Sequence, residues 1–380
     1  MSTLKNEKVA YFENIDILRG FAAVSVLVYH VIEHCQWSTF PSSGLLAWFR
    51  VGWLGVDLFF VISGFVIGLS AFSAIEHSGA AGFRQYFFIR RLARIVPLYY
   101  ATLIIFSLFV APALLFSNFF ANLAAHLFFV HNWFIHLHGS INGSNWSLGT
   151  EMQFYLLMIL VSPWLKNVQW HRFVCLFVLI AWVWRYSVSM LVSPTSDFGS
   201  FPIFIAATQL PGMLDEFAGG IVLARLVRSS YWPRLTTRKF LPIALAFFVA
   251  FCSTYITLSI YWKYASFWDY PLMIVFWRSL VAFSCTAVIL CALVLRVPLF
   301  LKAVSAPFKY LGTLSYGMYL WHLPVLLSLK RVDSVPPLSV LLITLCCSVL
   351  LASLSWHFYE QAFVLGASKA RDSRQLVSKI

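Results

Sequence analysis

The stretch Asn14–His34 combines a hydrophobic run with ionisable side chains, and these are the residues best suited to chemistry. Asp16, Arg19, His30 and Glu33 interrupt a segment that is long enough to cross a membrane. Eleven steps of about 100° return to nearly the same helix face, so Arg19 and His30 share a face roughly 16 Å apart. Asp16 and Glu33 fall near that face as well. Because ionisable groups in hydrocarbon turn toward cavities or partners, this helix is predicted to carry a polar stripe that other helices enclose.

A second group of candidate residues is the arginine cluster of FIRRLARIVPLYY, residues 88–100. Arg90, Arg91 and Arg94 lie at the start of a predicted span, with Arg91 and Arg94 on one helix face. They are either an anchor at the cytoplasmic surface or a site for a ligand with several phosphates, which guanidinium groups bind in pairs of hydrogen bonds. The sequence leaves both interpretations open.

Two carboxylates mark the outer ends of predicted spans. Asp57 lies in GVDLFFVISGFVIG, where it is predicted to position a polar acceptor or to pair with Arg50. Glu151 lies in NWSLGTEMQFY, in the first turns of a helix. There its carboxylate either compensates the helix dipole or takes part in a reaction, by orienting a base or by binding hydroxyl groups. Gly64 and Gly68 are predicted to let two helices approach closely.

Adjacent acidic residues interrupt a later apolar segment. Asp215 and Glu216 follow a Pro-Gly pair in the middle of the chain. Two acids in one span are costly, so at least one of them is predicted to face a cavity or to pair with Arg185 or Arg278. The pattern assigns them no role in chemistry.

The motif LSYGMYLWH near the end of the chain places Ser315, Tyr319 and His322 on one helix face. His322 is either a second cavity histidine or a structural one, and the structural interpretation is slightly favoured. The chain has no nucleophile elbow, phosphate-binding loop or dinucleotide fingerprint. A zinc site is not expected, because metal-ligand spacing is absent from the histidine-rich stretch that holds His126, His131, His136 and His138.

The composition indicates a polytopic membrane protein. Of the 380 residues, 61% are hydrophobic and 11% are charged, whereas a soluble domain is nearer a quarter charged. The net charge of +13 comes without a long basic tract, so it indicates loop topology rather than nucleic-acid binding. The seven cysteines lie mostly in apolar runs and are read as small buried residues, not as a disulfide framework.

The predicted fold class is all-α, with about ten transmembrane helices. The flanks on one side carry 20 lysines and arginines against four on the other, which predicts that both termini are cytoplasmic. The region 119–145 is predicted to be re-entrant or interfacial, because an extra span there would invert every later loop. The predicted spans lie near 15–34, 52–74, 96–117, 146–165, 173–193, 208–227, 240–261, 271–295, 310–329 and 338–360.

The predicted domain organisation is simple. Residues 1–14 form a cytoplasmic lead, 15–360 a single membrane domain, and 361–380 a short cytoplasmic tail. No repeat and no appended soluble domain is evident in the sequence.

Five segments in order resemble acyltransferase family 3, the integral membrane O-acyltransferases. Each motif is short, but their order is specific, and the resemblance covers nearly the whole chain. The segments are Arg19-x10-His30, GVDLFFVISGF, RRLARIVPLYY, NWSLGTEMQFY and LSYGMYLWH. The resemblance implies a roughly ten-helix fold in a bacterial cytoplasmic (inner) membrane. It also implies transfer of an acyl group, usually acetyl from acetyl-CoA, to an extracytoplasmic carbohydrate such as a cell-surface polysaccharide.

The resemblance also implies roles for individual residues. Arg19 and His30 match the essential pair of the family, and Glu151 and Asp16 match further polar positions. Arg90, Arg91 and Arg94 match the arginine motif associated with the acyl donor. Some members append an extracytoplasmic SGNH domain. The chain has no such length after its last span, so that step is expected to be absent or supplied by another protein.

The residue chemistry fits such a reaction. His30 can serve as general base for a sugar hydroxyl, oriented by Glu33 or Glu151. Arg19 would stabilise the oxyanion or seat the pantetheine arm of the donor. A transient acyl-histidine is the alternative to direct transfer, and both stay open.

Two other function classes compete with this one. A transporter or flippase for a sugar or lipid-linked glycan would share the spans and buried charges, but the internal repeats typical of transporters are not evident. A scaffold would not need Asp16, Arg19 and His30 in one span. The expected partners are the lipid bilayer, acyl-CoA as co-substrate and a carbohydrate acceptor, with no bound cofactor, metal or nucleic acid. The acceptor and the oligomeric state stay open.

Overall fold

The structure is a computed structural model, and it confirms the all-α prediction. The described residues are 12–165, 169–236, 240–264, 267–295, 302–331 and 335–367. Within these ranges the chain forms helices and short turns, with one isolated bridge between Thr195 and Gly199 and no strand.

Some predictions concern residues outside these ranges. They are most of the N-terminal lead and the last part of the tail, 1–11 and 368–380, together with the basic loop residues Lys166, Arg238, Lys239 and Arg296.

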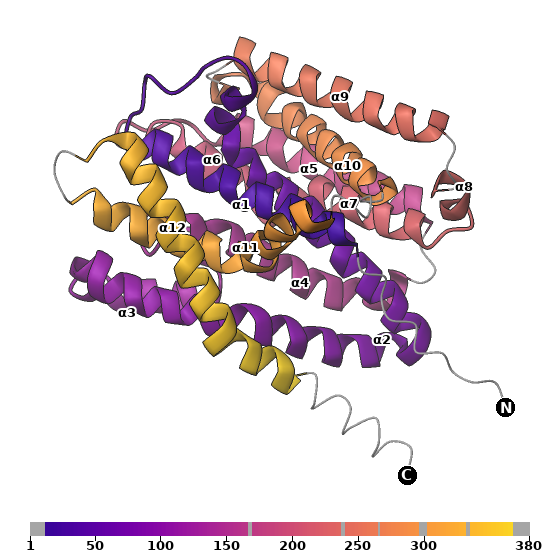
Figure 1. Cartoon of the computed structure of the whole chain (residues 1–380), viewed down its shortest axis with the longest axis horizontal. Helices are drawn as coiled ribbons and strands as arrows, with labels where there is room; N and C mark the ends of the chain where they lie inside the picture. Colours follow the sequence, from indigo (N-terminus) through magenta and orange to yellow (C-terminus); the bar gives the residue numbers. More distant parts are fainter. Residues whose placement is uncertain are drawn as a thin grey trace.

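Nine long helices and three short ones build the described part of the chain (Figure 1). The long ones are α1 (Glu13–His34), α2 (Gly55–Ile105), α4 (Trp146–Leu165), α5 (Trp170–Leu191), α7 (Leu210–Val227), α9 (Phe240–Lys263), α10 (Arg278–Val294), α11 (Lys302–Leu329) and α12 (Pro337–Ser355). The short ones are α3 (Phe119–Leu127), α6 (Phe201–Ala207) and α8 (Trp232–Thr236). Short 3-10 or π segments occupy Leu45–Leu54, Phe106–Val110, Pro112–Leu115, His131–Trp133, Gly143–Asn145, Phe267–Asp269, Met273–Trp277 and Trp356–Glu360.

The chain is an integral, multi-pass membrane protein by the length and hydropathy of its helices. Among the described residues, seven helices are long and apolar enough to cross a membrane. They correspond to seven of the ten predicted spans. The other three predicted spans form α4, α7 and α11, which do not belong to that set of seven. The count of ten therefore stays a prediction.

Helix α2 contains a break between the two spans that the sequence predicts at 52–74 and 96–117. Gly79 has φ +66° and ψ 178°, which lie outside the helical region and are accessible to glycine at no steric cost. The break separates the segment with Asp57 from the segment with the arginine cluster. As a result, one continuous stretch of chain contributes to both ends of the site described below.

Helix α1 lies in the middle of the bundle, as the polar stripe required (Figure 1). Glycines permit this close packing. A Cβ added to Gly312 of α11 would lie 1.9 Å from the carbonyl oxygen of Asp16, so only glycine fits there. Likewise, a Cβ on Gly64 would lie 2.2 Å from the carbonyl oxygen of Phe217 in α7. The predicted packing role of Gly64 is confirmed, and it seats α2 against α7.

The region 119–145 contains no spanning helix. Its one α-helix, α3, has nine residues, far fewer than the roughly 20 needed to cross a bilayer. The rest consists of turns, including two left-handed residues, Phe129 and Asn142. This agrees with the prediction of a re-entrant or interfacial segment.

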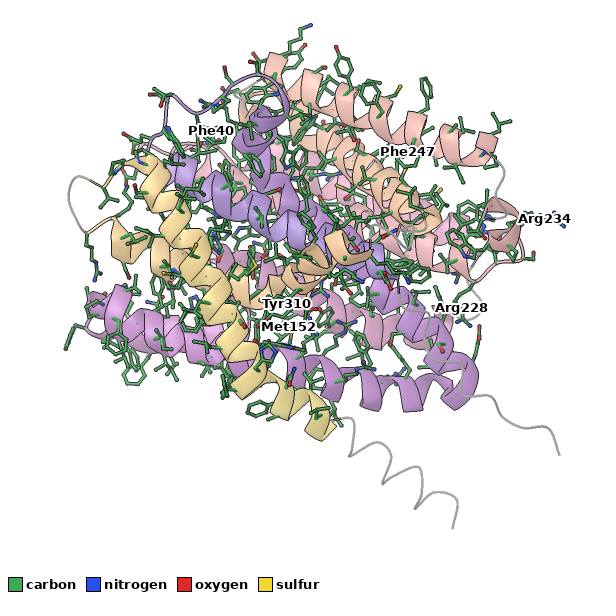
Figure 2. All side chains as sticks on the ribbon, viewed as in Figure 1. Phe40, Met152, Arg228, Arg234, Phe247 and Tyr310 are labelled. Carbon is green, nitrogen blue, oxygen red and sulfur yellow. The ribbon has the colours of Figure 1, made fainter. Side chains whose placement is uncertain are left out.

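The described ends of the chain lie toward one end of the molecule. Helix α1 begins and α12 finishes on that side (Figure 1). Figure 2 shows Arg228 and Arg234 at the same end, whereas Phe40, which follows α1, lies at the opposite end. This is the arrangement that an even number of spans requires. Which side of a membrane it faces stays a prediction.

Candidate active site

The polar residues of α1 reach two different cavities, one toward each end of the helix. Arg19 lines a cavity of about 320 Å³, and His30 lines another of about 430 Å³. Asp16 lies beside Arg19, with 3.7 Å between a carboxylate oxygen of Asp16 and Nη1 of Arg19. Glu33 is exposed. Arg19, Asp16 and His30 therefore belong to the enclosed stripe, whereas Glu33 lies at its open end.

The cavity around Arg19, called the arginine cavity below, is rich in positive charge. Arg90, Arg91 and Arg94 line it from the second half of α2. Aromatic rings hold two of these side chains in place. The guanidinium of Arg91 lies 5.4 Å from the ring centre of Tyr155, and that of Arg94 lies 5.7 Å from the ring centre of Trp356. Stacking of this kind fixes the direction of an arginine without neutralising it.

Glu151 also lines the arginine cavity, from the N-terminal turns of α4. Its Oε1 accepts hydrogen bonds from the Oγ of Ser63 at 2.6 Å and from the hydroxyl of Tyr155 at 2.5 Å. Two donors on one oxygen hold the carboxylate in a single position. The sequence analysis missed both donors, although Tyr155 follows Glu151 by four residues and therefore shares its helix face.

The cavity around His30, called the histidine cavity below, is lined mainly by aromatic rings. It is bounded mainly by α1, the start of α2, the region 119–145, α6, α10 and α11, with single residues from α4 and α9. Its polar lining comes from His30, His34, Asp57, His138, Arg278 and Tyr319. The aromatic lining consists of Tyr29, Trp53, Trp146, Phe201, Phe204, Tyr261, Phe267 and Trp268.

His30 has a histidine as its side-chain partner. The Nδ1 of His30 lies 3.0 Å from the Nε2 of His322 in α11, and the Nδ1 of His322 lies 2.7 Å from the carbonyl oxygen of Tyr319. The expectation that Glu33 or Glu151 orients His30 is therefore wrong, because neither carboxylate contacts it among the described residues. The slight preference for a structural His322 agrees with the structure, since this residue lines neither cavity and both of its ring nitrogens have partners, one of which is His30.

Two side chains separate the cavities. Val56 and Tyr319 line both of them. The hydroxyl of Tyr319 donates to the carbonyl oxygen of Ser144 at 2.7 Å and also lies 2.7 Å from the Oγ of Ser147. Tyr319 is thereby tied to the start of α4, and its ring forms part of the wall between the two spaces.

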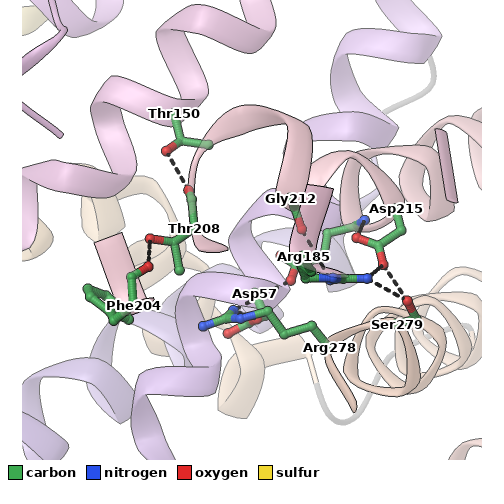
Figure 3. A network of polar contacts seen from close by, with 10 residues as sticks. Asp57, Thr150, Arg185, Phe204, Thr208, Gly212, Asp215, Arg278 and Ser279 are labelled. Atoms are coloured by element: carbon green, nitrogen blue, oxygen red, sulfur yellow. Dashed lines mark hydrogen bonds and ion pairs between the residues drawn. The ribbon is translucent and has the colours of Figure 1, made fainter. Parts of the chain in front are cut away.

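A buried ion pair forms one side of the histidine cavity (Figure 3). Nη1 of Arg278 lies 2.7 Å from Oδ1 of Asp57 and 3.8 Å from Oε1 of Glu216. The prediction that Asp57 pairs with Arg50 is wrong. Arg50 instead donates to carbonyl oxygens of the preceding loop, including that of Ser38 at 2.9 Å. The expectation that an acid of the Asp215-Glu216 pair meets Arg278 is confirmed.

The neighbouring acid has its own arginine. Arg185 of α5 is fully buried and lies 2.7 Å from Asp215, and it also donates to the Oγ of Ser279 at 2.8 Å (Figure 3). Ser279 in turn donates to Asp215 at 2.6 Å. This closed set joins α5, α7 and α10. It supports the helices next to the histidine cavity without lining it.

Two of the four histidines of the region 119–145 pack against each other. The rings of His126 and His131 stack with their centres 4.1 Å apart. Burial lowers the pKa of His126 and of His138 to about 4 and the pKa of His131 to about 3. These rings are therefore neutral at pH 7. Among the described residues, no group of three or more potential ligands lies close enough together for a metal ion.

Comparison with known proteins fixes the family. The acyltransferase domain of acyltransferase family 3 matches residues 12–357, which is most of the chain. The chain belongs to this family. Both cavities of this acyltransferase-family domain lie almost entirely within the matched residues.

Several curated relatives share the domain. The chain is 28% identical to the "Putative peptidoglycan O-acetyltransferase YrhL" of Bacillus subtilis, over 99% of the chain and 58% of that protein. It is 27% identical to the peptidoglycan O-acetyltransferase OatA of Listeria monocytogenes, over 92% of the chain and 55% of that protein. It is 26% identical to the O-acetyltransferase OatA of Staphylococcus aureus, over 92% of the chain and 57% of that protein. The chain thus spans less than 60% of the length of these relatives. No solved structure matches it.

Proposed function

We propose that the chain is a membrane O-acetyltransferase. It would move an acetyl group from cytosolic acetyl-CoA to a hydroxyl of a cell-wall carbohydrate on the other side of the membrane. The observation that carries the proposal is that one central helix presents Arg19 to an arginine-rich cavity and His30 to a separate cavity lined by aromatic rings. Family membership and the names of the relatives, two of which specify peptidoglycan, support the reaction and the class of acceptor.

The arginine cavity is assigned to the donor. Coenzyme A carries several phosphate charges, and guanidinium groups match phosphate geometry better than any other side chain. Four arginines and a single carboxylate, Glu151, line this cavity, so its charge favours a polyanion. Arg19 comes from α1, the helix that also carries His30, but it lies in the other cavity, roughly 16 Å along the helix, so it is assigned to seat the pantetheine arm of the donor.

The histidine cavity is assigned to the acceptor. Sugar rings present apolar faces as well as hydroxyls, and aromatic walls with a few polar groups suit such a ligand. His30 takes the proton of the acceptor hydroxyl, whose oxygen attacks the acetyl carbonyl. The carbon–sulfur bond then breaks, and the coenzyme A thiolate recovers the proton from the imidazolium. An acyl-histidine relay would use the same residue as nucleophile instead.

The membrane arrangement follows from this assignment. With ten spans and both termini in the cytoplasm, the arginine cavity opens toward cytosolic acetyl-CoA and the histidine cavity toward the outside. The basic end of the molecule, with Arg228 and Arg234, then lies at the cytoplasmic face (Figure 2). The membrane is proposed to be the bacterial cytoplasmic membrane.

The test is acetyl transfer in cells that lack the native gene. Wild type, His30→Ala and Arg19→Ala are expressed at matched membrane levels, and O-acetyl groups on the cell wall are measured by NMR. Wild type is expected to restore acetylation, and both variants are expected to abolish it. Full acetylation by His30→Ala would overturn the general-base role. Absence of acetylation by wild type, together with glycan export that depends on the protein, would replace this proposal with a transporter.

A further inference from the structure

We infer that His322 is a positioning residue that holds His30 in the tautomer with a proton on Nδ1 and a free lone pair on Nε2. The inference rests on the proposed role of His30 as the base. In this role, a residue of α11 acts through His30 rather than on a substrate. The role also gives a reason for the contact between His30 and His322.

The assignment starts from a group that can only accept. The carbonyl oxygen of Tyr319 lies 2.7 Å from the Nδ1 of His322, so that nitrogen must carry a proton. In a neutral ring, the Nε2 of His322 is then a bare acceptor. It lies 3.0 Å from the Nδ1 of His30, so the proton in that hydrogen bond belongs to His30. The Nε2 of His30 is left as the basic atom of the residue that lines the cavity.

The surroundings favour a neutral His322. Its side chain is 1% exposed, and within the described part of the chain no carboxylate pairs with it or with His30. The charged groups that share the cavity, Asp57 and Arg278, pair with each other at 2.7 Å. A cationic ring without a counter-ion is costly at such a site. If His322 were charged, its Nε2 would donate instead and the tautomer of His30 would reverse.

Packing fixes the position of the His30 ring relative to the His322 ring. Their centres lie 5.0 Å apart at an interplanar angle of 35°. An apolar cluster surrounds this part of α1 and α11, and it includes Leu27, Val31, Leu323 and Leu326. Because the backbones of the two helices also touch near Gly312, neither ring can shift independently of its helix. The geometry therefore resembles the orienting partner of a catalytic base, with a neutral imidazole in that place.

Three substitutions at one position test the inference. Glutamine can place an amide oxygen near the position of the lost Nε2, asparagine reaches only the position of Nδ1, and leucine offers no acceptor. We expect His322→Gln to keep acetyl transfer within about tenfold of wild type. His322→Asn and His322→Leu should lower kcat by about 100-fold, which is the low end for general-base catalysis. The KM for acetyl-CoA should stay unchanged, because the arginine cavity is intact.

The matched control is His357→Gln. The Nδ1 of His357 also meets a helix carbonyl, that of Ser353 at 2.9 Å, but the residue is exposed and lines neither cavity. It should transfer acetyl groups as wild type does. Equal losses in the glutamine, asparagine and leucine variants, all folded by thermal unfolding, would overturn the positioning role.

A second measurement does not depend on activity. In the full-length protein labelled with 15N-histidine, the nitrogen shifts of His30 report which atom is protonated. We expect a protonated Nδ1 in wild type and a mixture of tautomers in His322→Leu. A bare Nδ1 in wild type would overturn the inference. The expected shifts without any acetyl transfer would overturn the proposed function alone, so the two failures are distinguishable.

Discussion

The two cavities lie at the same central helix but differ in how their charges are balanced. The arginine cavity holds four arginines and one carboxylate, whereas in the histidine cavity Arg278 is matched by Asp57 and has Glu216 nearby. An excess of one charge suits a ligand that supplies the other charge. A balanced pair among aromatic rings suits a neutral ligand with many hydroxyls. Under the proposed function, this difference would select the two substrates by unlike physical means.

The largest expected effect is that of removing the base. His30→Ala should lower acetyl transfer by about 10²- to 10⁴-fold, since this is the usual contribution of a general base. The dissociation constant for acetyl-CoA should not change, because His30 does not line the arginine cavity. Coenzyme A release and equilibrium binding measure the two quantities separately. If His30→Ala weakened acetyl-CoA binding as well as acetyl transfer, the two cavities would not be independent.

The second effect concerns the balanced pair. Asp57→Ala leaves Arg278 buried with only the more distant Glu216, and removing one partner of a buried pair destabilises a protein by about 3–5 kcal/mol. Thermal unfolding in detergent should show the loss.

The control for that effect is the double variant Asp57→Ala/Arg278→Met, which removes both charges. It should recover much of the stability, because the uncompensated charge is gone. A double variant as unstable as the single one would mean that packing, not charge, dominates at this site.

A smaller effect is expected from a substitution in the arginine cavity. Arg91→Ala should raise the KM for acetyl-CoA by about 10- to 100-fold, which corresponds to the loss of one or two charge-assisted hydrogen bonds. The effect should weaken with added salt. Arg228→Ala, at the same end of the molecule but outside both cavities, is the control and should leave KM unchanged. Equal effects of both variants would favour a general surface field over a site.

The smallest expected effect is on the pH dependence of folding stability, which should differ between the surroundings of the two cavities. His131 has a pKa of about 3 when folded and about 6.5 when unfolded, so the unfolded chain binds more protons between these values. Its contribution to stability is complete above pH 6.5 and is lost as the pH falls toward 3. At pH 6 the loss is about 1 kcal/mol.

The variant His131→Phe tests that pH dependence. It should show a shallower fall of Tm between pH 7 and 5 than wild type. Because His138 of the same region lines the histidine cavity, acid should loosen that cavity before the arginine cavity. An unchanged pH slope in the variant would contradict the role of His131.

The sequence predicted what depends on spacing within one helix. The placement of Arg19 and His30 along α1, the common helix face of Arg91 and Arg94, and the packing of Gly64 all follow from local periodicity. Partners far apart along the chain were not predictable in this way.

Those distant partners account for the errors. His30 meets His322 across nearly the whole sequence, and Asp57 meets Arg278 rather than the nearby Arg50. Such pairings depend on which helices pack together, and the sequence indicated a distant partner only where ionisable groups interrupt spans, as for Asp215 and Glu216 with Arg185 and Arg278.

The wall of Val56 and Tyr319 has a consequence for the membrane itself. A protein with one cavity facing each side would be a pore if the two spaces joined, and the cell would lose its ion gradients through it. The two residues that line both spaces are one aliphatic side chain and one phenol ring tied to Ser144 and Ser147. Under the proposed function, this boundary would let a two-carbon group pass and would exclude a nucleotide. Acetyl groups would then leave the cell without coenzyme A.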